Sequence, residues 1–446
     1  MTDDPLTTAL LTARVPRYTS YPPADRFGPE VGSAAKTRWL GEIRPGARIA
    51  LYLHVPFCRR LCWFCACRSQ GTQAQAPLER YLDTLADEIA LTRAALPCNV
   101  EVASLHLGGG TPTILSADQL DRLGALLGEG FCFASGAEVS VEIDPCDFGP
   151  ARRDALLRLG LSRASIGVQD FDPLVQRAIG RLQSAEETAR AVDLIRAGGI
   201  GSLNVDLLYG LPHQTPARLL ATLDTTLGFM PDRIALYGYA HVPWAAKRQK
   251  LIDATALPGP RERLLLADTA RSRLMAAGYV PIGIDHFARP GDSMAVAAAQ
   301  GALRRNFQGY TVDADLPLVG LGPSAISQLP QGFVQNAPAT ALWAQMVEQG
   351  QLPGARGIVV GPAARAMGRV IAALMCDGRA DLPALTGDLA PDMIARAHAA
   401  LDALPGAGRL DKDGVLELED IRFARLVAHR IDSAAETGPR RYSQAC

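Results

Sequence analysis

Four cysteines lie within ten residues of one another in the segment LHVPFCRRLCWFCACR, which covers residues 53–68. They are Cys58, Cys62, Cys65 and Cys67, with the spacing C-x3-C-x2-C-x-C. Three kinds of site use thiols at this density: a structural zinc site, a disulfide-exchange site and an iron–sulfur cluster. The spacing helps to choose among them.

Structural zinc usually takes its four ligands from two separated pairs, and this segment has no second pair. A disulfide-exchange site favours one isolated C-x-x-C, so the additional thiols argue against it. An iron–sulfur cluster is held by thiolates. If C-x3-C-x2-C supplies only three ligands to four irons, the fourth iron is left open for another molecule, and the segment then predicts a site for chemistry.

The composition describes the protein around this segment. Among 446 residues, 48% are hydrophobic and 20% are charged, and 45 basic side chains almost balance 46 acidic ones. These values are typical of a soluble globular protein and give no global field for nucleic acid or membrane. The first residues, MTDDPLTTALLTAR, are acidic where a signal peptide is basic, and no apolar run is long enough to span a bilayer. We therefore expect a cytoplasmic protein.

Strand-like and helix-like segments alternate from residue 48 onward. Helix-like stretches such as 77–96, 184–199 and 215–230 separate the strand-like ones. About six βα repeats predict a parallel sheet with helices outside it, either a partial barrel or a flat sheet, with chemistry at the carboxyl ends of the strands. The strand-like segments are RIALYLHV, VASLHLGGGTP, AEVSVEID, RASIGVQ, SLNVDLLYGL and RIALYGYAHVP.

The pattern changes twice toward the C-terminus. Beyond about residue 258 it loosens into long helices and the glycine-rich PLVGLGPSAIS, and from about residue 357 it indicates two helices, a short β-ribbon and a final helix. The last part resembles a small winged-helix domain, but without a basic surplus we expect it to pack on the main domain rather than bind DNA. We predict an N-terminal arm (1–47), a main domain (48–356) and a mostly helical C-terminal domain (357–446).

Further candidate site residues follow the predicted strands. The run GGGTPT at 108–113 lets the backbone approach a ligand closely, although a plain tight turn would use the same residues. Glu142, Gln169 and Asp206 each lie near the carboxyl end of a successive predicted strand. Each alone could be a helix cap or a turn residue, but three in successive units favour one shared cavity.

The cysteine loop directly after the first strand of a βα array resembles the radical S-adenosylmethionine (SAM) superfamily. In that superfamily the open iron binds the amino and carboxylate groups of SAM, so the resemblance favours a partial (β/α)6 barrel over the flat sheet. Four segments narrow the resemblance to the oxygen-independent coproporphyrinogen III oxidase family. They are PRYTSYP (16–22), YLHVPFCRRLCWFCACR (52–68), SIGVQDFDPLVQRAIGRLQ (165–183) and RRNFQGYT (304–311).

This resemblance implies specific roles for residues. Cys58, Cys62 and Cys65 would bind a [4Fe-4S] cluster, while Cys67 belongs to the family pattern without being one of the three ligands. Tyr52, Gln308 and Ile326 would lie at the catalytic centre. The residues that would contact SAM, of which the family is thought to hold two molecules, are Tyr52, Phe64, Gly109, Gly110, Thr111, Glu142, Gln169, Arg181, Asp206, Ala240 and Ile326.

The resemblance also implies a reaction, the conversion of two propionate side chains of coproporphyrinogen III to the vinyl groups of protoporphyrinogen IX in haem biosynthesis. It requires an electron donor and an electron acceptor, neither of which the sequence names. The substrate is a tetracarboxylate, so basic side chains are expected near the cavity, although each candidate could equally be an ordinary surface arginine. The candidates are Arg17, Arg289, Arg304 and Arg305.

Two related functions compete with this interpretation: a haem chaperone with the same cysteine loop, and a radical methyltransferase that opens haem. Chaperones of this type generally lack the fourth cysteine and the PRYTSYP arm, and both are present here. We therefore expect an enzyme. We also expect a monomer that binds neither nucleic acid nor membrane.

Overall fold

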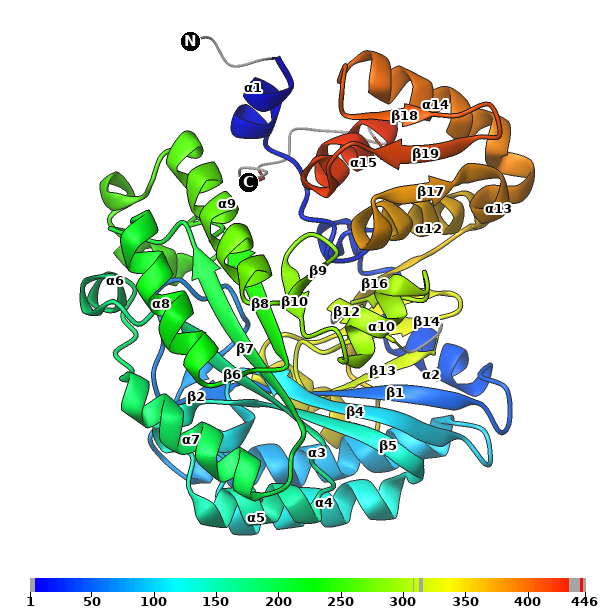
Figure 1. The fold of residues 1–446 in the computed structure, drawn as a ribbon. Helices are drawn as coiled ribbons and strands as arrows, with labels where there is room; N and C mark the ends of the chain where they lie inside the picture. The colour runs from blue at the N-terminus through cyan, green and yellow to red at the C-terminus, as the bar shows by residue number, and fades with distance from the viewer. Residues whose placement is uncertain (1–4, 308, 313–315, 433–441, 444–446) are drawn as a thin grey trace.

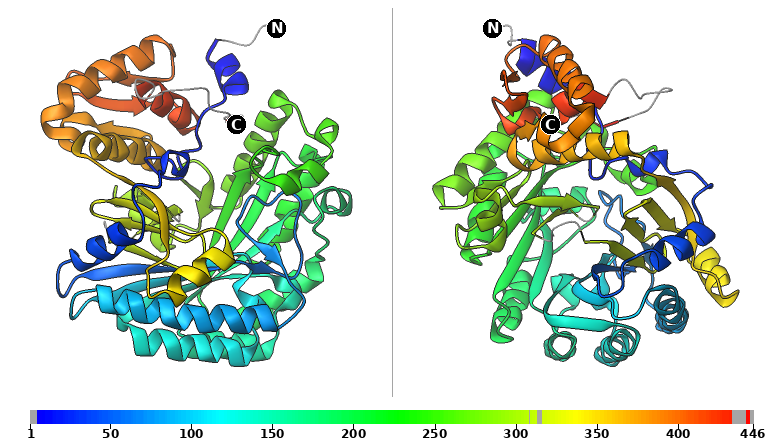
Figure 2. Two further views of the ribbon diagram at one scale, coloured as in Figure 1. Left: turned by 180° about the vertical axis from the view of Figure 1, so that it is seen from behind. Right: turned by 90° about the vertical axis from the view of Figure 1, so that its right-hand side faces the viewer.

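A computed structural model describes residues 5–307, 309–312, 316–432 and 442–443. Its centre is a curved sheet in which the six strands of the βα repeats run parallel, as does one further strand, Leu318–Leu321, beside the first of them; helices cover the outer face (Figures 1 and 2). This arrangement confirms the predicted partial barrel. In sheet order the six strands are β1 (Arg48–Val55), β4 (Glu101–Gly109), β5 (Cys132–Ile143), β6 (Arg163–Gln169), β7 (Ser202–Tyr209) and β8 (Arg233–Gly238).

Helices in the connections between these strands supply the outer layer. The end of one predicted helix is fixed by a capping box, because the Ser184 hydroxyl accepts from the Glu187 amide and the Glu187 carboxylate accepts from the Ser184 amide. Within the described part of the chain, none of the helices has the length and apolar composition needed to cross a membrane. The outer helices are α3 (Ala76–Ala95), α4 (Ala117–Gly130), α5 (Pro150–Arg158), α6 (Pro173–Ala178), α7 (Ala185–Ala197), α8 (Pro216–Gly228) and α9 (Pro260–Ala276).

Each parallel strand has one apolar face and one polar face. In β6, Ala164, Ile166 and Val168 are buried in the main core, whereas Arg163 and Ser165, at the alternate positions, are only half-buried. Successive side chains of a strand point to opposite faces, so the apolar set packs under the helices and the polar set faces the inside of the curve. The interior of the barrel is therefore a polar surface.

The sheet extends further than the sequence predicted. Long helices and a glycine-rich stretch were expected after residue 258, yet six more strands of this sheet lie there. Gly320 shows why the pattern was obscure: a side chain at this position would lie 2.8 Å from the Ile326 carbonyl, so a residue of low strand propensity occupies a buried strand. The added strands are β13 (Leu318–Leu321), β14 (Ile326–Leu329), β15 (Gly332–Asn336) and β16 (Gly354–Val359) beside β1, and β10 (His286–Ala288) and β9 (Val280–Ile282) beside β8.

Short elements lie around this extension. A two-stranded ribbon, β11 (Arg304–Asn306) and β12 (Gly309–Thr311), follows α10 (Ser293–Ala299) and lies near the open interior of the barrel (Figure 1). Helices α2 (Ser33–Gly41) and α11 (Thr340–Glu348) pack against the main core through Trp39 and Trp343.

A second apolar core unites the two ends of the chain. Leu10, Val15 and Tyr18 of the N-terminal arm pack in it with the C-terminal helices and a three-stranded sheet, and Figure 1 shows the arm passing beside these helices. The Asp432 carboxylate accepts hydrogen bonds from Tyr18 (3.3 Å) and Tyr21 (2.6 Å). The elements are α1 (Pro5–Thr12), α12 (Pro362–Asp377), α13 (Leu382–Thr386), α14 (Ala390–Asp402), α15 (Ala424–Asp432), and the sheet β17 (Arg379–Asp381), β19 (Val415–Leu418) and β18 (Gly408–Leu410).

A fully buried ion pair joins the extension of the sheet to the barrel. Lys36 Nζ of α2 lies 3.8 Å from Glu88 Oε1 of α3 and donates to Asn336 Oδ1 (2.7 Å). Glu88 also accepts from Trp343 Nε1 (2.8 Å) and Asn336 Nδ2 (2.7 Å). Because both charges are out of reach of water, removing one partner leaves the other charge buried without its counter-ion.

We therefore predict that Lys36→Met lowers the free energy of unfolding by roughly 3 to 5 kcal/mol. Arg38→Met in the same helix is the matched control, because the Arg38 side chain is 64% exposed and its pair with Glu42 is a surface pair. The control substitution should lower the free energy of unfolding by less than about 1 kcal/mol. Urea unfolding followed by circular dichroism measures both, and equal losses would contradict the role given to the buried pair.

Candidate active site

The cysteine loop begins at the carboxyl end of β1, and its base is closed by the short parallel pair β2 (Phe57–Cys58) and β3 (Gln70–Gly71). The glycine run at the end of β4 packs directly against it. The Gly110 amide donates to the Val55 carbonyl and the Thr111 amide to the Phe57 carbonyl, both at 2.8 Å. A side chain on Gly110 would lie 2.5 Å from the Phe57 carbonyl, so only glycine allows this approach.

The loop brings its thiols together at the inner edge of the barrel. Cys62 is buried, Cys58 and Cys65 are partly buried, and Cys67 is exposed. Burial raises the pKa of the Cys58 thiol, which the neighbouring Cys65 and Cys62 thiols raise further. A hydrogen bond from Cys67 lowers the pKa of Cys65 to about 6. Arg181 Nη1 donates to the Cys62 sulfur at 3.4 Å, which places a cation beside the anionic form that a cluster would need.

The donor set fits an iron–sulfur cluster better than a single ion. Among the described residues, no three His, Cys, Asp or Glu side chains are close enough together to bind one metal ion. Zinc would require such a set, whereas the thiolates of a cluster bind different irons and stand farther apart. Arg181 contacts Cys62, and Cys62 and Cys65 both lie near enough to Cys58 to affect its pKa, so the residues present fit the cluster.

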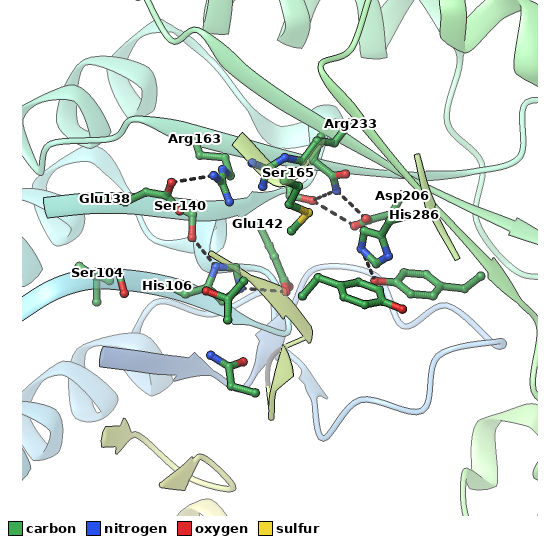
Figure 3. Close-up of a pocket in the computed structure, with 17 residues that line it drawn as sticks. Ser104, His106, Glu138, Ser140, Glu142, Arg163, Ser165, Asp206, Arg233 and His286 are labelled. Atoms are coloured by element: carbon green, nitrogen blue, oxygen red, sulfur yellow. Dashed lines mark hydrogen bonds and ion pairs between the residues drawn. The ribbon is translucent and has the colours of Figure 1, made fainter. Parts of the chain in front are cut away.

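A polar cavity of about 200 Å³ lies inside the barrel, next to this loop (Figure 3). Its wall is made by side chains at alternate positions of neighbouring strands, with residues of β8, β10, α10 and the β11–β12 ribbon completing it. In complete (β/α)8 barrels the interior is filled by branched apolar side chains, so a polar lining indicates a ligand site. The strand residues of the wall are Ser104 and His106, then Glu138, Ser140 and Glu142, then Arg163 and Ser165, then Asn204 and Asp206.

Glu142 connects the cysteine loop with the cavity. One carboxylate oxygen accepts from the Gly109 amide at 3.2 Å, and the other lies 3.4 Å from His106 Nε2. A carboxylate only accepts, so His106 Nε2 carries the hydrogen and Nδ1 accepts from the Ser140 hydroxyl at 2.6 Å. The Tyr52 ring stacks on His106 with centroids 5.8 Å apart. These contacts hold Glu142 between the cysteine loop and the cavity, and Figure 3 shows its contact with His106.

Tyr52 and His54 form a second chain of hydrogen bonds at the end of β1. His54 Nε2 lies 2.9 Å from the Arg68 carbonyl and must donate to it, so Nδ1 accepts from the Tyr52 hydroxyl, also at 2.9 Å. Burial lowers the pKa of His54 and keeps it neutral. Burial and the charge of Glu142 raise the pKa of Tyr52. His54 is thus a hydrogen-bonded structural group.

Asp206 is the second carboxylate of the cavity. It accepts from the Ser165 hydroxyl at 3.1 Å and from Asn204 Nδ2 at 2.8 Å. Burial and the nearby charge of Glu142 raise its pKa to about 6. The third carboxylate of the cavity, Glu138, is paired with Arg163, so Glu142 and Asp206 are the two that favour a cationic ligand or one with several hydroxyl groups.

The remaining predicted residues lie around the loop in different ways. Gln169 ends β6 with a φ of 75°, next to Arg181, which donates to the Gly167 carbonyl. Gln249 bridges two of them, since its side-chain amide donates to the carbonyls of Phe64 (2.8 Å) and Ala240 (3.1 Å).

Ile326 and Gln308 complete the predicted set. The Ile326 side chain is buried in an apolar cluster with Phe27 and Phe333, and its backbone lies against Gly320, the partner of Tyr52 in the sheet. Gln308 lies outside the described residues.

Two of the four candidate arginines lie near a common carboxylate. Arg17 and Arg305 both interact electrostatically with Asp285, and the Arg305 guanidinium stacks 4.5 Å from the centre of the Tyr310 ring. Arg304 instead donates to neighbouring backbone carbonyls. Arg289 hydrogen-bonds Tyr279 on another side of the sheet. Arg17 and Arg305 are therefore the arginines that the fold brings toward one region.

Sequence reasoning missed most of the cavity wall. Glu142 and Asp206 were identified from their place at strand ends, but their polar neighbours were not. A signal was present, since β4, β5, β6 and β7 each carry polar residues two positions apart among apolar ones. The missed wall residues are Ser104, His106, Glu138, Ser140, Arg163, Ser165, Asn204, Tyr237 and His286.

Comparison with known proteins gives consistent results. Residues 52–226 match the Radical SAM superfamily. The chain is 54% identical to the oxygen-independent coproporphyrinogen III oxidase of Paracoccus denitrificans over 82% of both chains, and 48% identical to that of Cereibacter sphaeroides over 98% of this chain and 97% of the relative. It is similar to the solved structure of coproporphyrinogen III oxidase (HemN) from Escherichia coli, described as a radical SAM enzyme. The TM-score is 0.88 at 35% identity, covering 95% of this chain and all of that one.

The thiol geometry predicts different effects for the four cysteines. Serine at Cys58, Cys62 and Cys65 together should abolish iron binding after anaerobic reconstitution, because all three proposed ligands are lost. Cys67→Ser, the matched control in the same loop, should keep most of the iron, since Cys67 is exposed and not a proposed ligand. The iron and sulfide content and the visible absorption spectrum of each reconstituted variant measure how much cluster it holds. Iron loss in Cys67→Ser equal to that in Cys62→Ser would instead make Cys67 a ligand.

Proposed function

Because the chain belongs to the oxygen-independent coproporphyrinogen III oxidase family of the radical SAM superfamily, we propose that it decarboxylates two propionates of coproporphyrinogen III oxidatively, giving protoporphyrinogen IX. The observation that carries this proposal is the junction at Glu142. The cysteine loop and the polar cavity meet there, so a ligand can reach both at once.

Members of this family use a [4Fe-4S] cluster and SAM, which together supply one-electron chemistry when bound. Cys58, Cys62 and Cys65 would hold the cluster. The backbone of Gly109 to Thr111 offers polar groups beside the loop. The carboxylates of Glu142 and Asp206 would accept hydrogen bonds from ribose hydroxyls and offset the sulfonium charge.

The other predicted residues would orient and shield this arrangement. Phe64 lies in an apolar cluster beside the loop with Ile179 and Tyr239 and would help to exclude water. Tyr52 would fix His106, and through it Glu142. Gln169, Arg181 and Ala240 surround the same loop, and Ile326 supports Tyr52 from the neighbouring strand.

Arginine side chains would bind the carboxylates of the substrate. Arg17 comes from the PRYTSYP segment and donates to the Gly238 carbonyl at the end of β8. Arg305 lies on the ribbon that helps to close the cavity. Both would pair with propionates that are not being decarboxylated, because guanidinium groups bind carboxylates with charge-assisted hydrogen bonds.

The cavity also distinguishes the enzyme from a haem carrier. A carrier for a flat macrocycle with acidic side chains needs an apolar surface flanked by cations. The interior of this barrel is instead lined by polar side chains of both charges: Glu138 is paired with Arg163, while Asp206 accepts hydrogen bonds from the neutral Ser165 and Asn204. This lining suits a sulfonium compound with ribose hydroxyls better than haem.

The affinity for SAM should depend on pH through Asp206. Its pKa of about 6 means that falling pH protonates it and removes a negative charge from the cavity. The dissociation constant of SAM should rise roughly tenfold between about pH 7 and about pH 5. Asp206→Asn should bind weakly at all pH values, and Glu142→Gln should move the midpoint to lower pH. Isothermal titration of reconstituted protein measures this, and a pH-dependent Asp206→Asn would refute it.

Anaerobic turnover tests the function itself. With dithionite, SAM and an electron acceptor, the protein should release two carbon dioxide molecules per coproporphyrinogen III and form protoporphyrinogen IX, methionine and 5′-deoxyadenosine. Cys62→Ser is the control that lacks a cluster ligand and should be inactive. Stable stoichiometric haem binding without decarboxylation by the reconstituted protein would assign it to the carriers.

A further inference from the structure

Three segments near the cysteine loop carry positive charge only. Residues 59–70, 173–183 and 241–252 contain eight Lys and Arg residues and no Asp or Glu, in a chain whose net charge is −1. Two of the four lysines of the whole chain, Lys247 and Lys250, are among them. A local concentration of one sign of charge in an almost neutral chain points to a partner of the opposite sign.

Hydrogen bonds join these segments into one surface. The Trp63 amide of the loop donates to the Ile179 carbonyl at 2.9 Å, and Arg60 donates to the Leu182 carbonyl. On the other side of the loop, Arg248 donates to the Cys67 carbonyl at 3.2 Å. Segments 173–183 and 241–252 therefore both contact segment 59–70 of the cysteine loop. We call the exposed part of the three segments the loop face.

The eight cations divide into two groups. Arg59 and Arg60 pair with Asp147 and Asp144, while Arg181 and Arg248 bind the cysteine loop itself. These four side chains make contacts within the protein itself. The other four are exposed, and the structure pairs none of them with a carboxylate in the described part of the chain: Arg68, Arg177, Lys247 and Lys250.

Exposed apolar side chains accompany these charges. Leu61 is 37% exposed, Trp244 47%, and Leu182 and Leu251 60% each. With Leu174, the three segments hold five of the fourteen large hydrophobic side chains that are exposed in the described residues. Exposed apolar side chains together with cations are a composition suited to binding a protein partner. Trp and Arg are among the residues that contribute most to the binding energy of such interfaces.

We propose that the loop face is the docking surface of a small acidic carrier protein that delivers single electrons to the cluster. This inference rests on the proposed function. In the transfer the carrier loses one electron and the oxidised cluster gains it, with no atom exchanged. The loop face suits this role because segment 59–70 contains two of the proposed cluster ligands, Cys62 and Cys65, and directly follows the third, Cys58, so a carrier docked there contacts the loop that would hold the cluster.

The type of charge also agrees with a transient partner. A carrier must bind, transfer its electron and leave at each turnover. Exposed lysines are strongly hydrated and flexible, so they steer an approaching acidic protein without fixing it. The chain has only four lysines and places two of them at this one face. Lys412, the other exposed lysine, lies in the C-terminal sheet region, away from the cysteine loop.

The test uses reconstituted holoenzyme and a bacterial flavodoxin, an acidic FMN protein, as the probe. The double variant Lys247→Glu/Lys250→Glu should weaken flavodoxin binding at low salt at least about tenfold and slow cluster reduction by reduced flavodoxin to a similar extent. Added salt should weaken binding to the unmodified protein and have little effect on the variant. Surface plasmon resonance gives the affinity, and stopped-flow absorbance gives the rate.

Matched controls make the result specific. Lys412→Glu changes the same residue type far from the loop face and should bind flavodoxin normally. Cytochrome c, a basic carrier, should not bind. Unchanged affinity in the double variant, an equal loss in Lys412→Glu, or binding of cytochrome c would overturn the proposal.

Turnover with dithionite separates this proposal from the proposed function, because a small reductant needs no docking surface. The double variant should keep full dithionite-driven decarboxylation. If the unmodified protein fails that assay, the proposed function fails, whatever the flavodoxin results.

Discussion

The alternation of side chains along six parallel strands is the constraint on which this structure depends. In β5, Val139, Val141 and Ile143 are buried outward under the helices, while Glu138, Ser140 and Glu142 face inward. Burial of the outward set supplies the driving force for folding. The inward set can therefore remain polar, and an incomplete barrel keeps a cavity where a complete one would be packed.

Close approach of backbone segments then joins the cavity to the cysteine loop. Gly110 has no side chain, so the amides of Gly110 and Thr111 after β4 can donate to the carbonyls of Val55 and Phe57, and the Gly109 amide reaches the Glu142 carboxylate. The cysteine loop is thus fixed to the same strands that carry the cavity. The geometry of the site follows from two strand ends and does not require a long mobile loop.

The termini of the chain close the structure around this centre. Asp432, near the end of α15, accepts from Tyr18 and Tyr21 of the N-terminal arm and pairs with Arg26. These contacts fix the arm so that Arg17 donates a hydrogen bond to the carbonyl of Gly238, at the end of β8. A segment without regular structure becomes part of the site because the C-terminal helices hold it there.

The sequence by itself determined the repeating βα pattern, the spacing of Cys58, Cys62 and Cys65, and the place of Glu142 and Asp206 at strand ends, because these features are local in the chain. Only the tertiary structure decided that His106 supports Glu142 and that Arg248 lies beside the cysteine loop. It also decided that β13 to β16 extend the sheet. Each of these depends on contacts between segments far apart in the sequence, which periodicity and propensity do not encode.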